Sequence, residues 1–261
     1  MKVAIIGSGN MGGALARAWI KQKIFPAENI TCTAKTAGTL EKLKNEFPTI
    51  NTTGDNAAAV VDADLILLCV KPWLIASIAQ TISKHVRAGT TIVSVAAGVS
   101  LDTLESLFGN EKKIKFYRVI PNTALACEQS MTFIATRDGN AKTTLDVPAL
   151  FEKLGKVKII DESKMAAGTA LASCGIAYGM RYIRAASEGG VELGFTPTEA
   201  REIVLQTLRG AVELLETSGL NPEAAIDQVT TPGGLTIRGL NAMETAGFTA
   251  AVIAGLKTSN K

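Results

Sequence analysis

The chain has 261 residues, of which 47% are hydrophobic and 20% charged, and its formal net charge is +3. This length and apolar content suffice for one large domain or two modest ones with a buried core. The charge is dispersed, without a basic block that could follow a nucleic-acid backbone, and no apolar run reaches the ~18 residues that a membrane span needs. We therefore expect neither nucleic acid nor a membrane as a partner.

The chain opens with a glycine-rich turn between a predicted strand and a predicted helix. An apolar, β-branched run at residues 3–6 precedes it, and a helical stretch at 14–20 follows. Three glycines lie between at the spacing G-x-G-x-x-G, a dinucleotide-binding fingerprint. Gly7 allows the tight turn, Gly9 lets the backbone approach a pyrophosphate, and Gly12 lets the helix pack on the strand. We expect a nicotinamide cofactor here; a glycine turn without a ligand is the alternative.

Strand and helix signals alternate over the first 160 residues. Strands are predicted at residues 3–6, 30–33, 65–70, 91–95, 115–120, 131–136 and 156–160, with helices between them at stretches such as 38–47, 73–85 and 101–108. Continuous apolar strands alternating with helices indicate a mostly parallel sheet covered on both faces, to which the later strands can add antiparallel members. We expect residues 1–160 to form an α/β Rossmann-type dinucleotide-binding domain.

The pattern becomes helical from residue 161 to 261, and no strand is predicted there. Helices are expected at residues 165–184, 198–217, 222–229, 235–246 and 248–256. The first of them is rich in alanine and glycine, and because glycine weakens a helix by roughly 1 kcal/mol each, close packing must offset the loss. We expect an all-α dimerisation domain that buries its faces against a second protomer; an intrachain helical bundle is the alternative.

The segment after the second predicted strand bears on the choice of cofactor. NAD-selective folds place an Asp or Glu there to bind the ribose 2′-hydroxyl. This chain has no carboxylate in that segment, but it has Thr33, Lys35 and Thr36. A cation and hydroxyls suit a 2′-phosphate. We therefore expect NADPH, with NADH as the alternative cofactor. A further alternative is a solvated loop that accepts both cofactors without discriminating between them.

Three further strand ends are expected to border the same crevice, because ligands of open α/β sheets bind at the carboxyl ends of the strands. They carry Val70, Lys71 and Pro72, then Ala96 and Ala97, then Pro121 and Asn122. The small residues at 96 and 97 leave space for a nicotinamide ring. The alternative is that the two prolines simply end their strands.

A second constellation lies in the helical half, at residues 229–237. Two threonines, Thr230 and Thr231, precede a Pro-Gly-Gly break, and Thr236 lies in the first turn of the helix that follows. Backbone N–H groups at a helix start, with hydroxyls beside them, suit a carboxylate. We expect an anion to bind here; a plain helix cap is the alternative.

Cysteine and histidine usage limits the remaining chemistry. Cys32, Cys69, Cys127 and Cys174 have no metal-ligand spacing, so we expect no metal. Scattered cysteines, together with a chain that enters a strand at once and leaves no room for a signal peptide, favour a reducing cytoplasm. The single histidine, His85, is expected at a helix end on the surface. The chemistry is therefore not expected to use an imidazole base.

The motifs, taken together, resemble those of the pyrroline-5-carboxylate reductase family. They are GSGNMG at 7–12, VKP at 70–72, AAGV at 96–99, RVIPNT at 118–123, SEGGV at 187–191 and TTPGGLTIRGL at 230–240. They occur in family order and span nearly the whole chain. The last is the family's own signature, whereas the first is shared with many dehydrogenases. Two departures are Ile176, where the family has a helix-kinking proline, and Glu188, where it has an aspartate.

The resemblance implies reduction of Δ1-pyrroline-5-carboxylate to L-proline by hydride transfer from NAD(P)H, the last step of proline biosynthesis. It also implies a homodimer or a decamer built of dimers, with the cyclic imino acid as small-molecule substrate. Carried over, the substrate residues are Thr231, Gly234, Leu235 and Thr236, and Thr236 is the catalytic candidate. The cofactor residues are Gly7, Ser8, Gly9, Asn10, Met11, Gly12, Asn56, Val70, Lys71, Ala96 and Ala97.

A cyclic imine is a suitable substrate for a protein without a histidine base, because its protonated form accepts hydride directly. Two other functions remain as alternatives. A β-hydroxyacid-type dehydrogenase would need a lysine base, for which Lys164 is the candidate, although the glycines expected around such a lysine are missing. A non-catalytic NADP-binding protein is the other, and the intact Thr-Pro-Gly-Gly loop argues against it.

Overall fold

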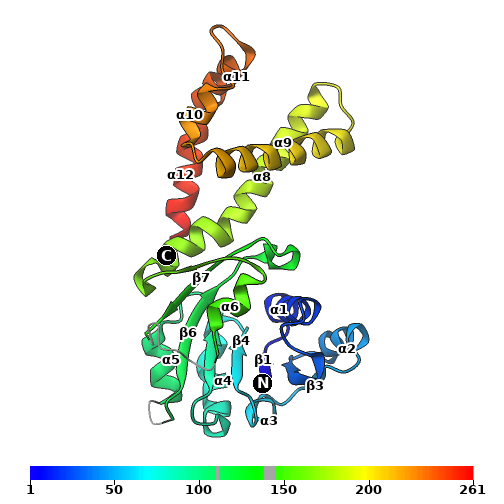
Figure 1. Ribbon diagram of the computed structural model, residues 1–261, viewed down its shortest axis with the longest axis vertical. Coiled ribbons are helices and arrows are strands. Elements are labelled where there is room, and N and C mark those ends of the chain that lie inside the picture. The colour runs from blue at the N-terminus through cyan, green and yellow to red at the C-terminus, as the bar shows by residue number, and fades with distance from the viewer. Residues whose placement is uncertain (110–111, 138–144, 261) are drawn as a thin grey trace. The chain divides into compact units, whose positions relative to one another are not determined.

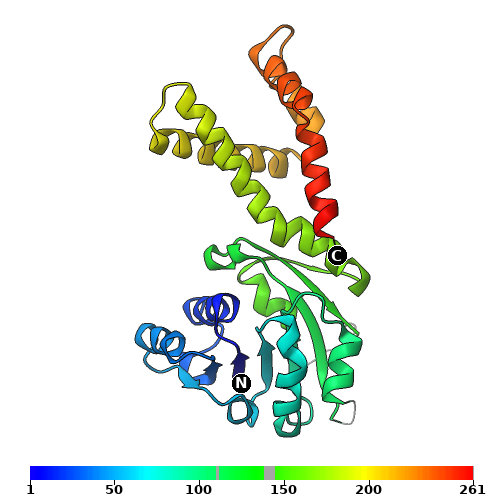
Figure 2. The same ribbon diagram turned by 180° about the vertical axis from the view of Figure 1, so that it is seen from behind.

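The computed structural model describes residues 1–109, 112–137 and 145–260 (Figure 1). These residues form two compact units, Met1–Ser173 and Cys174–Asn260. The first contains a β-sheet with helices, and the second is helical (Figure 2).

The first unit is built on an eight-stranded sheet, within the described ranges, in the order β3-β2-β1-β4-β5-β6-β7-β8. The strands are β1 (Val3–Ile6), β2 (Ile30–Thr33), β3 (Asn51–Thr53), β4 (Leu65–Leu68), β5 (Thr91–Ser94), β6 (Lys115–Ile120), β7 (Ser130–Thr136) and β8 (Gly155–Ile159). Adjacent strands are parallel except β6 and β7, which are antiparallel. The sequence missed β3, because this three-residue strand contains only polar side chains and gives no apolar signal.

Helices cover both faces of the sheet, as the continuous apolar strands require. One face packs against α1 (Asn10–Lys21), α2 (Ala37–Glu46) and α6 (Val147–Glu152), and the other against α3 (Asn56–Val60), α4 (Ile75–Ile82) and α5 (Leu101–Phe108). The 3₁₀ turns are η1 (Ala27–Asn29), η2 (Pro72–Leu74), η3 (Ser83–His85), η4 (Thr123–Cys127) and η5 (Glu162–Lys164). Each face of the sheet has its own hydrophobic core, and alternate residues of β1 point into each. Val3 and Ile5 belong to one core, and Ala4 and Ile6 belong to the other.

Three aromatic side chains pack together in the core between the sheet and helices α1, α2 and α6. The Trp19 side chain is fully buried, and its ring packs edge-on against Phe25 at 5.3 Å and Phe151 at 5.8 Å between centroids. The indole nitrogen of Trp19 donates to the Leu150 carbonyl at 3.2 Å, which satisfies its polar atom. The group therefore fastens α1, which carries the glycine turn, to α6.

The helix predicted to run unbroken from residue 165 is instead interrupted, so that prediction is wrong in this detail. A short helix α7 (Met165–Gly168) leads into a π-helical segment η6 (Thr169–Cys174), and α8 (Gly175–Glu192) follows. Gly168 packs directly on the Phe133 ring, where a Cβ would lie 2.8 Å from Cδ2. The Thr169 hydroxyl donates to the Met165 carbonyl at 2.8 Å, a bond that competes with the regular helix ladder.

The division into compact units falls later than the predicted domain boundary at residue 160. Met165 is buried with Ile120 and Phe133 of the sheet, so the residues that follow the last strand belong to the first unit. The sequence marks where strands end, whereas the units are defined by packing. The two therefore differ by about one helical turn and the π-helical segment.

The second unit consists of α8, α9 (Pro197–Ser218), α10 (Pro222–Asp227), α11 (Leu235–Thr245) and α12 (Phe248–Ser259). Helices α8 and α9 pack closely at Gly190, where a Cβ would lie 2.9 Å from the Ala200 Cβ. Thr196 and Glu199 form a capping box at the start of α9. The Tyr178 hydroxyl bonds the Ser259 hydroxyl at 2.5 Å and the Gly255 carbonyl at 3.3 Å, which ties α12 to α8.

This helical unit has almost no core of its own. Among its described residues only Ala200 is buried. Large apolar side chains are exposed on its helices and the loops between them, namely Met180, Tyr182, Val191, Leu193, Phe195, Ile203, Val212, Leu214, Leu220, Val229, Leu235, Met243, Phe248, Val252 and Ile253. Helices that expose this much apolar surface need a partner to cover it. The observation favours association over the intrachain bundle.

Replacing Phe151 with alanine tests the aromatic core. The Phe151→Ala variant should lose about 3–5 kcal/mol of unfolding free energy, because it leaves a cavity beside Trp19. The measurement is urea unfolding followed by tryptophan fluorescence. Val61→Ala, at a side chain that is 47% exposed, is the control and should change stability by less than about 0.5 kcal/mol. Equal effects of the two would contradict this account of the core.

Candidate active site

The glycine turn between β1 and α1 depends on close backbone contacts. Gly7 has φ +93°, a conformation that residues with side chains rarely adopt. Its N–H donates to the Thr33 hydroxyl at 3.2 Å, and the Ser8 N–H donates to the Thr33 carbonyl at 2.7 Å, so the end of β2 holds the turn. Gly12 lies directly over the turn, and a Cβ there would be 2.3 Å from the Gly7 carbonyl oxygen.

A cavity of about 590 Å³ opens where β1, β2, β4 and β5 end. It is lined by Gly7, Ser8, Gly9, Asn10, Met11, Ala34, Lys35, Thr36, Thr39, Cys69, Val70, Lys71, Pro72, Leu74, Val95, Ala96 and Ala97. All of these residues belong to the first unit. The carboxyl ends of four neighbouring strands thus meet at one pocket, as the parallel sheet predicts.

The cavity floor fits the pyrophosphate of a dinucleotide. A Cβ at Gly9 would meet no atom within 4 Å, so this position leaves open space above the turn. Helix α1 begins here without a side-chain cap, which leaves its first N–H groups for an anion. The Ser8 hydroxyl is buried beside the Cys32 thiol. The fit rests on these unfilled positions and unpaired donors.

One end of the cavity is cationic and rich in hydroxyls. Lys35 is exposed and makes no ion pair with any described residue. The Thr36 and Thr39 hydroxyls lie 2.8 Å apart at the start of α2. No Asp or Glu is among the lining residues. This combination suits a 2′-phosphate better than a free ribose hydroxyl.

The thiols beside the turn are structural. Burial raises the pKa of Cys32 to about 11, and burial, with the neighbouring Cys32, also raises the pKa of Cys69 well above its usual value. A thiol held neutral in this way is a poor nucleophile at neutral pH. Both residues therefore act as small apolar side chains under the cavity.

The structure brings most of the predicted cofactor residues together at the cavity. Those that line it are Gly7, Ser8, Gly9, Asn10, Met11, Lys35, Val70, Lys71, Pro72, Ala96 and Ala97. Gly12 and Thr33 contact the turn and shape it without lining the cavity. Asn56 begins α3, directly after its cap Asp55, and is not part of the lining.

Pro121 and Asn122 also lie outside the cavity lining, at the end of β6. The Asn122 amide donates to the Ala172 carbonyl at 3.4 Å, and the Pro121 carbonyl accepts from the Ser173 hydroxyl at 3.4 Å. Both contacts are with the π-helical segment. These two residues therefore hold the segment that leads into α8.

Sequence reasoning missed Ala34, Thr39, Cys69, Leu74 and Val95 as cavity residues. Four of them are direct or near neighbours of predicted positions, and the rule of strand carboxyl ends could have included them. Thr39 is the informative omission, because it lies one helical turn beyond Thr36 and presents its hydroxyl beside that of Thr36. A search at i+3 from Thr36 would have found it.

The second constellation forms a tight loop before α11. Gly233 has φ +69°, and the Gly234 N–H donates to the Thr231 carbonyl at 2.9 Å. A Cβ on Gly234 would lie 2.4 Å from the Thr231 hydroxyl oxygen, so only glycine fits there. The Arg238 guanidinium donates to the Gly233 carbonyl at 2.8 Å and fixes the loop from the helix.

Helix α11 begins with free donors. Its N-cap residue is Gly234, and no side chain caps the helix. Leu235 is 85% exposed, Thr236 is exposed, and the Thr236 hydroxyl has no hydrogen bond to any described residue. The N–H groups of the first turn and this hydroxyl together can hold a carboxylate. This geometry favours anion binding over a simple cap.

The rival candidates for acid–base chemistry are on the surface. His85 ends η3 and is exposed, and Lys164 ends η5 and is exposed. Within the described ranges, no three His, Cys, Asp or Glu residues are grouped so that they could hold a metal ion. None of the helices in those ranges is long and apolar enough to cross a membrane.

A glycine turn under a dinucleotide-sized cavity, followed by helices that lack a core, defines a Rossmann-type NAD(P)-dependent oxidoreductase with an association domain. Family models agree. Residues 2–98 match "NADP oxidoreductase coenzyme F420-dependent", and residues 162–261 match "Pyrroline-5-carboxylate reductase dimerisation". The chain belongs to the pyrroline-5-carboxylate reductase family.

Individual relatives support the same assignment over the full chain. Pyrroline-5-carboxylate reductase 2 of Dictyostelium discoideum is 34% identical over 98% of this chain and 90% of its own. Reductase 1 of that organism is 38% identical over 99% of this chain, which spans 48% of that longer protein. The crystal structure of Plasmodium falciparum pyrroline carboxylate reductase with NADP bound has a TM-score of 0.89 at 26% identity, and covers 99% of this chain and 95% of that one.

These comparisons confirm the family, the fold class and the oxidoreductase class that the sequence predicted. The dimerisation model, which covers the helices without a core, indicates that the chain forms homo-oligomers. The family acts on a small molecule, as expected. The individual site residues are not tested by these likenesses and remain predictions.

Two glycine substitutions test the turn. Gly12→Ala should lower stability and NADPH binding together, because its Cβ would meet the Gly7 carbonyl. Gly9→Ala should weaken NADPH binding roughly tenfold or more while the melting temperature changes little, because its methyl group occupies only the space for the phosphates. Fluorescence titration and thermal unfolding measure the two effects. Gly38→Ala, also in open space, is the control; normal binding by Gly9→Ala would contradict the proposed phosphate position.

Proposed function

We propose that this protein reduces Δ1-pyrroline-5-carboxylate to L-proline with NADPH, the last step of proline biosynthesis. The single observation that carries the proposal is the uncapped start of α11, where the Thr231–Gly234 loop and a free Thr236 hydroxyl occur in a chain that also has a dinucleotide cavity. Family membership supplies the substrate: the relatives are named pyrroline-5-carboxylate reductases.

The reaction needs orientation more than acid–base machinery. The imine nitrogen of the substrate is protonated, so its C5 carbon is electrophilic. NADPH supplies the hydride to C5; the C=N bond becomes a single bond, and NADP⁺ and L-proline result. The Gly7–Met11 turn holds the phosphates, and the small side chains of Ala96 and Ala97 leave room for the ring.

The substrate carboxylate binds at the N–H groups of Leu235 and Thr236, next to Gly234, whose own N–H is bonded to the Thr231 carbonyl. These donors carry the positive end of the helix dipole and need no competing side-chain cap. Thr231 shapes the loop through its contact with Gly234. The Thr236 hydroxyl hydrogen-bonds near the ring nitrogen and relays a proton there, which makes Thr236 the catalytic residue of the proposal.

The cofactor is NADPH, with NADH as a weaker substitute. Support comes from Lys35, Thr36 and Thr39 at the end of the cavity, from the absence of a carboxylate among its lining residues, and from the relative of known structure that binds NADP. Asn56, Pro121 and Asn122 remain proposed contacts that the cavity lining does not include.

We also propose a homodimer, or a decamer built of dimers, in which residues 161–261 provide association and substrate binding while residues 1–160 bind the cofactor. The apolar surface exposed on α8, α9 and α12 supports the association. We place the protein in the cytoplasm; the four free cysteines are compatible with a reducing compartment.

Thr236→Ala tests the substrate half of the proposal. Turnover should fall roughly tenfold or more, because the hydroxyl that contacts the imine nitrogen is lost. The dissociation constant for NADPH should stay within twofold, since that cavity belongs to the other unit. NADPH oxidation at saturating pyrroline-5-carboxylate gives the rate. Thr236→Ser keeps the hydroxyl and should retain most of the turnover; unchanged turnover in Thr236→Ala would remove this residue from the chemistry.

Charge reversal at Lys35 tests cofactor choice. Lys35→Asp should raise the KM for NADPH roughly tenfold or more and leave that for NADH nearly unchanged, because a charge-assisted contact with the 2′-phosphate becomes repulsive. Steady-state assays with both cofactors measure the ratio. Lys42→Asp, which makes the same charge change on the exposed side of α2 outside the cavity lining, should leave the ratio unaltered. An equal change in both variants would indicate a general charge effect instead.

A further inference from the structure

An ion pair between a buried arginine and a half-buried glutamate lies next to the nicotinamide end of the cavity, outside its lining. Arg118 of β6 pairs in the sheet with Ser94 of β5, and Arg118 is only 9% exposed. One guanidinium nitrogen, Nη1, donates to Glu162 Oε1 at 2.8 Å. The Arg118 Nε atom is buried without a partner among the described residues. A buried arginine that is paired with one carboxylate is weak evidence that the pair stabilises the fold. The other bonds of this carboxylate indicate a different role for the pair.

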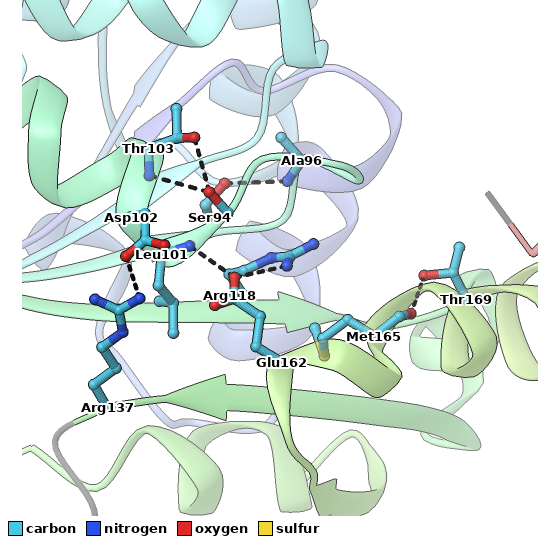
Figure 3. A network of polar contacts seen from close by, with 11 residues as sticks. Ser94, Ala96, Leu101, Asp102, Thr103, Arg118, Arg137, Glu162, Met165 and Thr169 are labelled. Carbon is cyan, nitrogen blue, oxygen red and sulfur yellow. Dashed lines mark hydrogen bonds and ion pairs between the residues drawn. The ribbon is translucent and has the colours of Figure 1, made fainter.

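The Glu162 carboxylate accepts hydrogen bonds from both β6 and α5. Its Oε1 atom also accepts the N–H of Leu101, the first residue of α5, at 2.7 Å (Figure 3). That N–H is one of the donors that a helix start leaves without an internal partner. The carboxylate thus lies between the Arg118 guanidinium and the end of the loop that enters α5.

The loop in question, residues 95–100, is held at both ends. At its start the Ala96 N–H donates to the Ser94 hydroxyl at 3.3 Å, and at its end Glu162 holds Leu101. Between these points Val95, Ala96 and Ala97 line the cofactor cavity. The position of the loop therefore determines the shape of the cavity where the nicotinamide ring is expected.

We infer that Arg118 and Glu162 act as a pair of positioning residues that hold the 95–100 loop in place for the nicotinamide ring. Arg118 fixes the carboxylate, and the carboxylate fixes the loop end; neither residue lines the cavity. Loss of the pair lets the loop move, so that the cofactor binds more weakly and its ring is less well aligned with the substrate. This inference rests on the proposed function and adds to it residues that act from behind the site.

The chain offers a matched control on the same helix. Arg137 forms ion pairs with Asp102 and Glu105, on the exposed side of α5 (Figure 3). The Arg137 side chain is 49% exposed. Arg137 makes neither hydrogen bond that holds the ends of the 95–100 loop, so removing it loosens α5, and its weak electrostatic interaction with Glu162, while both bonds remain. A merely structural contribution of the Arg118–Glu162 pair would therefore be reproduced by Arg137→Met.

The experiment compares Glu162→Ala, Glu162→Gln, Arg118→Met, the Glu162→Ala/Arg118→Met double variant and Arg137→Met in the full-length protein. NADPH dissociation constants come from fluorescence titration, and kcat and KM from steady-state assays. We expect Glu162→Ala to raise the dissociation constant and lower kcat about tenfold each, with the KM for pyrroline-5-carboxylate within twofold. Glu162→Gln keeps an acceptor for Leu101 and should rescue most of the loss.

The double variant tests whether the two residues act as a unit. Adding Arg118→Met to Glu162→Ala should bring no further loss, because the arginine acts only through the carboxylate. With NADPH deuterated at the transferred position, the isotope effect on kcat should rise in Glu162→Ala, since hydride transfer becomes slower. Arg137→Met should change neither binding nor the isotope effect.

Several results would overturn the inference. They are NADPH binding and kcat of Glu162→Ala within twofold of Arg137→Met, or additive losses in the double variant. If Glu162→Ala does not fold, Arg118→Met decides: a loss of threefold or more supports the pair, and a change within twofold overturns it. A wild-type protein that fails to bind NADPH would overturn the proposed function as well, which separates that failure from failure of this inference alone.

Discussion

The approach of α1 to the end of β1 is the constraint on which the rest of the structure depends. The Gly12 backbone lies so close to the Gly7 carbonyl that no side chain fits between them. This approach directs the uncapped start of α1 into the cavity and places the neighbouring strand ends around it. The aromatic group at Trp19 then holds α1 in place through Phe151. Packing on one face of the sheet thus serves phosphate binding at its edge.

The glycine turn before α1 and the loop before α11 both present an uncapped helix start, but different residues hold them in place. At Gly7–Gly12 the uncapped helix start is held by the end of β2, through the hydroxyl and carbonyl of Thr33. At Thr231–Gly234 it is held by its own loop and by Arg238. Both leave backbone N–H groups for an anion, because neither helix start has a side-chain cap. A chain with one exposed histidine therefore still offers two uncapped helix starts suited to anions.

The sequence predicted what local patterns encode. Apolar runs gave seven of the strands, and the spacing of Gly7, Gly9 and Gly12 located the turn. It missed β3, whose polar residues give no apolar period, and the π-helical segment, which begins directly after the contact between Gly168 and Phe133. It could not reveal the bonds of Pro121 and Asn122 to the π-helical segment, because these contacts join residues about 50 positions apart in the chain. Long-range packing decided each of these cases.

The helical unit has too few buried residues to be stable as a single chain. Only Ala200 is buried among its described residues, while α8, α9 and α12 expose large apolar side chains. At about 25 cal/mol per Å² of apolar surface, covering these faces supplies the stabilisation that the unit does not generate within one chain. The loop at Thr231–Gly234 belongs to the same unit. Association therefore stabilises the unit that carries this loop, and the stability of that unit should rise with protomer concentration.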